Sequence, residues 1–387
     1  MAGRLDTRLI DREVRSLLAA ARWSAADLEQ VLATVARIDP ADADSWLREW
    51  TATGGEAWAA GQRERAPGQF LCAASYYGTA LALIAESDGF VDETALWLRQ
   101  RECWDRAVLE MGGAAVTVPY EMGRLPGYLF SGGRGRRPVV VVDPGGRMPT
   151  SQAWAQVAAA AHRRGAHVLI FDGPGRQAAL RLGGLVARPD WEAVITPVVE
   201  LLLAREDVDG ARMAVVGMEF GALGVARALT AEHRFAAAAL LPGVLDGARP
   251  WMAQMPDAVH AALVDAERDV FERELHLASL FDPEINDRLR RAASWFDPGG
   301  LDLYELYRRI RTFRFEPAGT GQVLTPTMVV CDPLDDGPWS GQSSELAAAL
   351  GPAATLVHGR RPEDALADWL DDVFCRATDV PVAVSTR

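Results

Sequence analysis

The chain has 387 residues, of which 49% are hydrophobic and 24% charged, and its formal net charge is −13 at pH 7. A chain of this length and composition buries a large core and exceeds one compact domain, so we expect a main domain with one or two smaller ones. The acidic balance and the lack of a dense run of Lys and Arg argue against a nucleic acid or a membrane surface as partner and favour a small molecule.

The cysteines and the first residues bear on cofactors and location. Four cysteines, Cys72, Cys103, Cys331 and Cys375, are scattered without metal-ligand spacing, which argues against a zinc site and a disulfide framework. The start, "MAGRLDTRLIDREV", is charged throughout, and no window reaches about 18 uninterrupted apolar residues. We therefore expect a reduced, cytoplasmic protein without metal, organic cofactor, signal peptide or membrane span, and we leave open whether it forms a homodimer.

The first third of the chain has a helical pattern. Residues 1–113 are rich in Ala, Leu, Arg and Glu, with Trp at helical spacings as in "ADADSWLREWTATGGEAWAAG", and this predicts an N-terminal helical module. From Ala115 the sequence changes to "AAVTVPYEMGRLPGYLFSGG". These two alternating runs around a Gly turn predict an antiparallel hairpin that enters a sheet.

Continuous apolar runs of strand length then alternate with helical segments. The runs are "PVVVVDPGG", "AHVLIFDGPG", "RMAVVGMEFG", "FAAAALLPGV" and "PTMVVCDPLDD". Strands that are apolar on both faces are typical of a mostly parallel sheet covered by helices on both sides. We predict an α/β core in two parts, 114–244 and 323–387, interrupted by a helical cap at 245–322 that lies over the carboxyl ends of the strands, where open α/β sheets bind ligands.

The segment "VVGMEFGALGVARAL" has the outline of a strand, a tight turn and a helix. Gly217 and Gly221 bracket Glu219 as the glycines of a G-x-S-x-G elbow bracket a nucleophilic serine, because the turn packs too tightly for side chains on either side. The serine position is occupied by a glutamate.

The chain resembles the α/β-hydrolase superfamily from about Ser45 to Leu370. The features that carry the resemblance are "SWLREW", "VPYEMGRLPGYLF", "FDGPG", "RPDWEAV", the elbow and a late "DWL" helix. They resemble the branch that contains 2,6-dihydroxypseudooxynicotine hydrolase, the fungal polyketide-shortening hydrolases of pigment pathways and the fermentation-respiration switch proteins. The resemblance implies a capped α/β-hydrolase fold and a polyketide-like or aromatic carbonyl substrate.

The resemblance also implies positions for the reacting groups. It places the nucleophile at Glu219 and one oxyanion-hole N–H at the next residue, Phe220. The second N–H would come from the turn after "VVVV", at Gly145 or Gly146.

The remaining members of the family's triad fall late in the chain. The acid corresponds best to Asp335, with Asp336 as the alternative. The histidine corresponds to His358, the one histidine near the last strand, while Arg360 or Arg361 stands closer to the family's place for it.

The replacement of serine leaves three interpretations of Glu219, besides serine-type hydrolysis through some other residue. A buried carboxyl near Asp335 would have a raised pKa and suit general acid/base work, in a cyclisation, dehydration or C–C cleavage. Alternatively, Glu219 is a carboxylate nucleophile, which needs a histidine to activate water. In the third interpretation the protein is an inactive ligand-binding relative, in which Glu219 pairs with Arg147, Arg176 or Arg360.

Several tryptophans fall in or beside the expected cap. Trp251, Trp295 and Trp339 are expected to line an aromatic-tolerant pocket, and Trp339 in particular to bind substrate.

Overall fold

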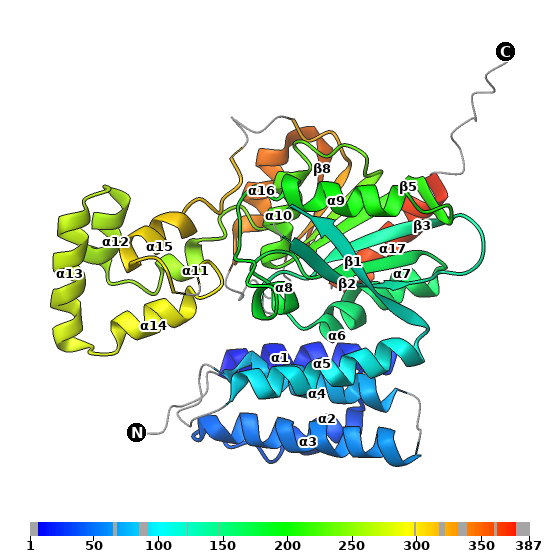
Figure 1. Ribbon diagram of the computed structural model, residues 1–387, viewed down its shortest axis with the longest axis horizontal. Coiled ribbons are helices and arrows are strands. Elements are labelled where there is room, and N and C mark those ends of the chain that lie inside the picture. The colour runs from blue at the N-terminus through cyan, green and yellow to red at the C-terminus, as the bar shows by residue number, and fades with distance from the viewer. Residues whose placement is uncertain are drawn as a thin grey trace.

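The computed structural model describes residues 7–64, 68–84, 92–121, 123–146, 148–297, 299–316, 322–331, 339–359 and 362–376. A central sheet carries helices on both faces, with one group of helices below it and another projecting to one side (Figure 1). This arrangement confirms the predicted α/β class with an N-terminal helical module and a helical cap.

The N-terminal helices form a compact layer beneath the sheet (Figure 1). They are α1 (Thr7–Ala20), η1 (Ala21–Trp23), α2 (Leu28–Val35), α3 (Ala43–Glu64), α4 (Gln69–Ala82) and α5 (Glu93–Glu110). Trp46 and Trp50 stand one helical turn apart on α3, so both rings face α4 and are fully buried. The Trp46 indole N–H donates to the Thr79 carbonyl at 2.8 Å, which satisfies its buried polar atom.

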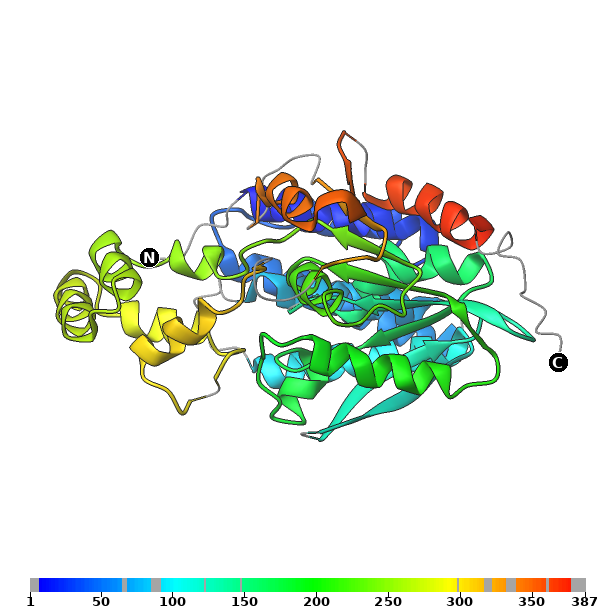
Figure 2. The same cartoon turned by 90° about the horizontal axis from the view of Figure 1, so that it is seen from above.

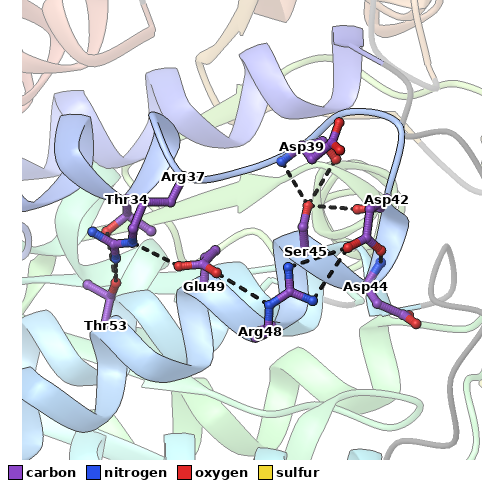
Figure 3. Close-up of polar contacts among 9 residues, drawn as sticks. All are labelled: Thr34, Arg37, Asp39, Asp42, Asp44, Ser45, Arg48, Glu49 and Thr53. Atoms are coloured by element: carbon purple, nitrogen blue, oxygen red, sulfur yellow. Dashed lines mark hydrogen bonds and ion pairs between the residues drawn. The ribbon is translucent and has the colours of Figure 1, made fainter.

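A polar network fastens α2 to α3 (Figure 3). The Ser45 hydroxyl lies 2.9 Å from the Asp39 carbonyl oxygen and 2.7 Å from that of Asp42, so its single proton is shared between them. This contact closes the connection between the helices. Glu49 accepts a hydrogen bond from Arg37 at 2.8 Å, and this bond lowers the pKa of the Glu49 carboxyl. Thr34, Ser45 and Thr53 of this network are buried, whereas the charged Arg37, Asp39 and Arg48 side chains are exposed.

The sheet has eight strands in the order β1-β2-β4-β3-β5-β6-β7-β8. They are β1 (Gly113–Tyr120), β2 (Gly123–Phe130), β3 (Arg137–Asp143), β4 (His167–Phe171), β5 (Val208–Met218), β6 (Ala237–Leu241), β7 (Thr327–Val330) and β8 (Ala354–Val357). β1 and β2 form the predicted antiparallel hairpin, and β2 joins β4 antiparallel. All pairs from β4 to β8 are parallel.

Helices cover both faces of the sheet because its apolar strands are buried on both. The helices of the core are α6 (Thr150–Ala153), the π-helical turn η3 (Trp154–Ala158), α7 (Ala159–Arg163), α8 (Gln177–Arg181), α9 (Glu192–Leu203), α10 (Phe220–Ala228), α16 (Gln342–Leu350), η4 (Gly351–Ala353) and α17 (Pro362–Arg376). Along β3, Val139 and Val141 join the apolar cluster that contains α9, α10 and the cap. Val140 and Val142 join the cluster that contains the N-terminal module. This alternation follows from the two-residue period of a strand.

The cap consists of α11 (Arg249–Met252), α12 (Asp257–Val264), α13 (Arg268–Phe281), α14 (Ile285–Ala292) and α15 (Leu303–Ile310). Figures 1 and 2 show α12 to α14 standing away from the sheet. The two segments that lead into and out of the cap run side by side, since the Gly247 N–H donates to the Phe313 carbonyl at 2.9 Å and the Phe315 N–H to the Leu245 carbonyl at 2.7 Å. We call this pair of segments the stem.

A buried amide fixes the stem to the core. The fully buried Gln342 side chain accepts from the Leu245 and Asp246 N–H groups at 2.9 and 2.6 Å and donates to the Asp246 carbonyl at 3.1 Å. In the part of the chain that the structure describes, no helix has the length and apolar character to cross a bilayer. Nor do three or more His, Cys, Asp or Glu side chains of these residues form a metal-binding group.

Candidate functional site

Glu219 occupies a strained turn between β5 and α10. Its φ of 49° and ψ of −125° lie in a region that residues other than glycine rarely adopt, at a cost of about 1–3 kcal/mol. The Glu219 N–H donates to the Leu241 carbonyl at 2.9 Å, and the Glu219 carbonyl accepts from the Ala222 N–H at 2.9 Å. The surrounding hydrogen bonds therefore hold the strained conformation in place.

The two glycines of the turn are required by close backbone contacts. A Cβ atom at Gly217 would lie 2.7 Å from the Cα of Ala222, and one at Gly221 would lie 2.5 Å from the Asp143 carbonyl oxygen. No relaxation of a flexible side chain relieves either contact, because both neighbours are backbone. The turn thus has the tight elbow geometry that the glycine spacing predicts.

Glu219 stands at a helix end that favours negative charge. The residue is half-buried and stands at the N-terminus of α10, where unpaired N–H groups and the helix dipole carry positive partial charge. Phe220 is the first residue of the helix, so its N–H has no acceptor within the helix. A negative oxygen beside Glu219 would find this donor.

The structure describes the predicted histidine position but not the predicted acid positions. Asp335, Asp336, Arg360 and Arg361 lie outside the described residues. His358 follows β8 and is exposed to solvent, in contrast to the half-buried glutamate of the elbow. A histidine that serves as the base of a triad is held in the site by its partners, and exposure is a poor setting for that role.

A buried ion pair that was not predicted lies next to the elbow. Asp143, at the end of β3, is fully buried and pairs with Arg176, which is 2% exposed. The Trp191 indole N–H donates to the second Asp143 oxygen at 2.8 Å, and the Arg176 guanidinium lies 4.0 Å from the centre of the Trp191 ring. Arg176 is therefore the partner of Asp143. Arg147 and Arg360, the other two arginines considered for Glu219, lie outside the described residues.

Asp143 also accepts a hydrogen bond from Gly145, one of the two candidates for the second oxyanion-hole donor. The Gly145 N–H donates to the Asp143 carboxylate at 3.2 Å, which leaves Gly146 as the second donor to consider. Gly145 has φ 78°, and a Cβ there would lie 2.6 Å from the Met218 carbonyl oxygen. The glycine turn after β3 is thus in contact with the elbow.

Aromatic rings of the cap, the stem and the segment before α16 form a cage around the Phe220 side chain. Ring centres lie 5.7 to 6.4 Å from that of Phe220 for five residues, namely Trp251, Trp295, Phe296, Phe313 and Trp339. The three tryptophans are those expected beside the pocket. Trp339 is buried, and its indole N–H has no acceptor among the described residues.

The space next to this cage is small. A cavity lined by Phe220, Phe313, Trp191 and neighbouring arginines, Arg176 among them, has a volume of about 10 Å³, which is close to the minimum needed for one water molecule. A ligand of several atoms therefore needs a ring or the cap to move before it can occupy this part of the interface.

The N-terminal module contacts the loop that carries Arg176. Arg101 of α5 pairs with Asp172 at 3.3 Å, and the Trp97 indole N–H donates to the Gln177 amide oxygen at 2.8 Å. Burial raises the pKa of the Asp172 carboxyl, and Arg101 opposes this shift. These contacts make the module part of the support for the site.

Comparison with known proteins shows similarity to hydrolases. Hydrolase LUC6 of a Fusarium species is 31% identical over 255 residues, 60% of each chain, and alpha/beta hydrolase pydG of an Acremonium species is 26% identical over 360 residues, 86% of this chain and 82% of that protein. The structure of 2,6-dihydroxy-pseudo-oxynicotine hydrolase superposes with a TM-score of 0.68 at 17% identity, over 94% of this chain and 97% of that chain. The chain therefore has the α/β-hydrolase fold and is similar in sequence to fungal hydrolases.

The sequence matches to fungal hydrolases support the branch predicted from the sequence. No family model matches the sequence. The match to the Fusarium hydrolase spans about 60% of that protein's length, and the likeness to the solved structure, at 17% identity, concerns the fold alone. Both relatives and the solved structure are named as hydrolases.

Proposed function

We propose that this protein is an enzyme that acts on a small aromatic or polyketide-like carbonyl compound, with Glu219 as general acid/base in a cyclisation, dehydration or C–C cleavage. The observation that carries the proposal is the strained backbone of Glu219, with φ 49°. It presents a carboxyl group, in place of a hydroxyl nucleophile, at the end of β5. Strain of this kind is concentrated at functional sites.

For a dehydration, the steps balance as follows. The Glu219 carboxylate takes a proton from the carbon next to the substrate carbonyl, and the electron pair moves onto the carbonyl oxygen as an enolate. The Phe220 N–H and the N-terminus of α10 stabilise this oxygen. The enolate then re-forms the carbonyl and a C=C bond and expels a β-hydroxyl group, which receives the proton from Glu219 and leaves as water.

A nucleophilic role for Glu219 is the weaker candidate. The ester intermediate that a carboxylate forms must be hydrolysed by water that a base activates. The exposed position of His358 does not favour this step. A non-catalytic role in ligand binding is the third candidate, and turnover distinguishes it from the first two.

The aromatic cage supports the substrate class, because flat apolar rings suit aromatic or conjugated ligands. The resemblance to polyketide-shortening hydrolases supports it independently. A small molecule as partner and a cytoplasmic location remain part of the same proposal.

Proton transfer can be tested without the natural substrate. α-Tetralone is a bicyclic aromatic ketone whose C2 protons exchange with deuterium through the enolate, which NMR follows in D₂O. We expect Glu219→Gln to slow the enzyme-dependent exchange roughly 10² to 10⁴-fold, the usual share of a general base. Glu345→Gln, at an exposed site on α16, is the matched control. Equal exchange in wild type and Glu219→Gln would contradict the proposal.

Ester hydrolysis provides the complementary test. Wild type is expected to cleave p-nitrophenyl acetate no faster than Glu219→Ala, because the elbow has no hydroxyl group. Glu219→Ser alone should not create an efficient esterase, since loss of a triad member costs on the order of 10⁴ in rate. Efficient cleavage by the serine variant would mean that His358 reaches the elbow.

A further inference from the structure

The ring of Trp295 covers the glycine turn beside the elbow. A Cβ atom at Gly146 would lie 1.9 Å from Cζ3 and 2.3 Å from Cη2 of the Trp295 indole, so the six-membered part of that ring fills the space into which a side chain would project. The same ring is 6.4 Å from the Phe220 ring, centre to centre. Whatever binds at the glycine turn must first displace this indole.

Trp295 is held less firmly than the rings around it. Trp251 is buried, and its indole N–H donates to the Ala292 carbonyl at 2.8 Å, while Phe296 is completely buried. Trp295 is half-buried, and within the described parts of the chain its indole N–H donates to no protein acceptor. Its backbone is anchored, because its carbonyl accepts from the Ala187 N–H at 2.9 Å. The side chain can therefore rotate about its own bonds while the backbone stays in place.

We propose that Trp295 is the gate of this site, and that the slot its ring vacates takes a planar aromatic or conjugated ring system about as large as an indole. The inference rests on the proposed function, since it takes the slot to be that of the substrate. The backbone of Gly146 forms one wall of the slot. Phe220 and Trp251 stand at steep angles to the Trp295 ring, at 75° and 73°, and so present edge-to-face contacts to any ring that replaces it.

The slot matches the chemistry proposed for the elbow. A flat ring stacked on Gly146 lies beside the turn that contacts the Phe220 N–H, because the backbone of Gly145 is packed against that residue. A carbonyl group attached to the ring is thereby brought toward this N–H and toward Glu219. A saturated ring of the same skeleton is thicker than an indole and does not fit the same slot.

The test is equilibrium binding of two matched probes. 1-Naphthol is flat, and decahydro-1-naphthol has the same skeleton and hydroxyl group without the planarity. If the gate is closed nine tenths of the time, it weakens the apparent affinity for a ligand about tenfold. Measured by calorimetry, Trp295→Ala should therefore bind 1-naphthol about tenfold more tightly than wild type. Its affinity for the saturated alcohol should not increase. Trp58→Ala, a half-buried tryptophan of the N-terminal module, is the control and should leave both affinities unchanged. Unchanged or weaker 1-naphthol binding by Trp295→Ala, or an equal gain for both probes, would overturn the proposal.

A second measurement observes the ring directly and does not depend on how well the alanine variant folds. In protein labelled with 5-fluorotryptophan, the Trp295 resonance is the one lost in Trp295→Phe. Saturation with 1-naphthol should shift it, and decahydro-1-naphthol should not. A Trp295 resonance that stays in place at saturating 1-naphthol would also overturn the gate.

These experiments separate the gate from the proposed function. If the affinity gain is seen but α-tetralone exchange does not depend on Glu219, the gate stands and the acid/base role fails. If exchange depends on Glu219 but Trp295→Ala changes neither affinity, the acid/base role stands and the gate fails.

Discussion

The N-terminal module and the cap are both helical, but they are attached to the sheet in different ways. Module and sheet share one apolar cluster, in which Trp104 of α5 touches Phe130 and Trp154, with ring centres 6.2 and 6.5 Å away. The cap reaches the core through the stem and the aromatic cage, while α12 to α14 stand apart from the sheet (Figure 2). The cap also shares an apolar cluster with the other face of the sheet, but because its outer helices lie away from the sheet we expect them to be coupled to the core less strongly than the module is.

Polar contacts join both regions to the core, but those of the cap lie outside α12 to α14. The module is tied to the loop after β4 by Arg101 and Trp97, two separate points on α5. The stem of the cap is held by the buried Gln342 side chain. Elsewhere in the cap, Arg309 donates to the Ala187 carbonyl at 2.9 Å, and the Ala187 N–H donates to the Trp295 carbonyl at 2.9 Å. We therefore expect lesions in the module to lower the stability of the whole protein and lesions in the cap to act locally.

The largest effect is expected from Phe130→Ala, at the interface of sheet and module. Phe130 is fully buried, and its ring centre lies 4.3 Å from that of Trp154. Deletion of a buried Phe side chain typically costs about 3–5 kcal/mol, and here the loss should appear in the unfolding of the whole chain. Urea denaturation should show a single transition at lower urea. A separate early transition limited to the module would refute the shared core.

The same deletion inside the cap should have a smaller global effect. Phe271 of α13 is 1% exposed and lies 5.3 Å from the Tyr304 ring, so the local loss is again about 3–5 kcal/mol. In Phe271→Ala we expect faster hydrogen exchange in residues 257–310, with the main urea midpoint shifted less than in Phe130→Ala. Equal midpoint shifts in the two variants would show that cap and core unfold together.

A change in the stem should have an effect smaller than that of the two Phe deletions and larger than that of the pH-dependent contact described last. Gln342→Leu introduces an apolar side chain of similar size and leaves the Leu245 and Asp246 N–H groups without their acceptor. An unsatisfied buried donor costs about 1–3 kcal/mol. We expect faster proteolysis within the cap than in wild type. Gln254→Leu, the same change at an exposed cap position, should have little effect. Equal proteolysis rates in the two variants would mean that Gln342 does not hold the stem.

Much of the fold could be predicted because local patterns determine it. The apolar runs "PVVVV" and "HVLIF" became β3 and β4, since strands buried on both faces need no alternation. The elbow followed from two glycines at positions where a Cβ atom would have no room. Both signals lie within a few residues of the feature that they predict.

The contacts that shape the site depend on segments far apart in sequence. Asp143 and Arg176 meet because β3 and β4 are neighbours in the sheet, and the sequence shows only that each residue follows a strand. Trp295 rests on Gly146 because the cap folds back over the glycine turn. No periodicity encodes either contact. The positions predicted for Asp335 and Asp336 remain predictions.

The smallest effect concerns pH and the contact between the module and the loop after β4. Burial raises the pKa of Asp172 above its ordinary value of 3.8. The folded state therefore holds this proton more tightly than the unfolded chain, and the stability that the proton contributes is complete below pH 3.8 and lost as the pH rises through the folded-state value. Asp172→Asn cannot ionise, so its free energy of unfolding should improve relative to wild type as the pH rises above 3.8, whatever constant cost the loss of the Arg101 pair adds.

Asp371→Asn provides a control of opposite sign. Asp371 is exposed, and a hydrogen bond from Arg164 lowers its pKa below 3.8, so its contribution is present above pH 3.8 and lost as the pH falls through the folded-state value. Relative to wild type, this variant should gain stability as the pH falls and Asp172→Asn as the pH rises. Urea midpoints measured from pH 3 upward test both slopes. A wild-type curve parallel to that of Asp172→Asn would mean that the Arg101 charge fully offsets the burial of Asp172, and that the module supports the loop by a neutralised ion pair.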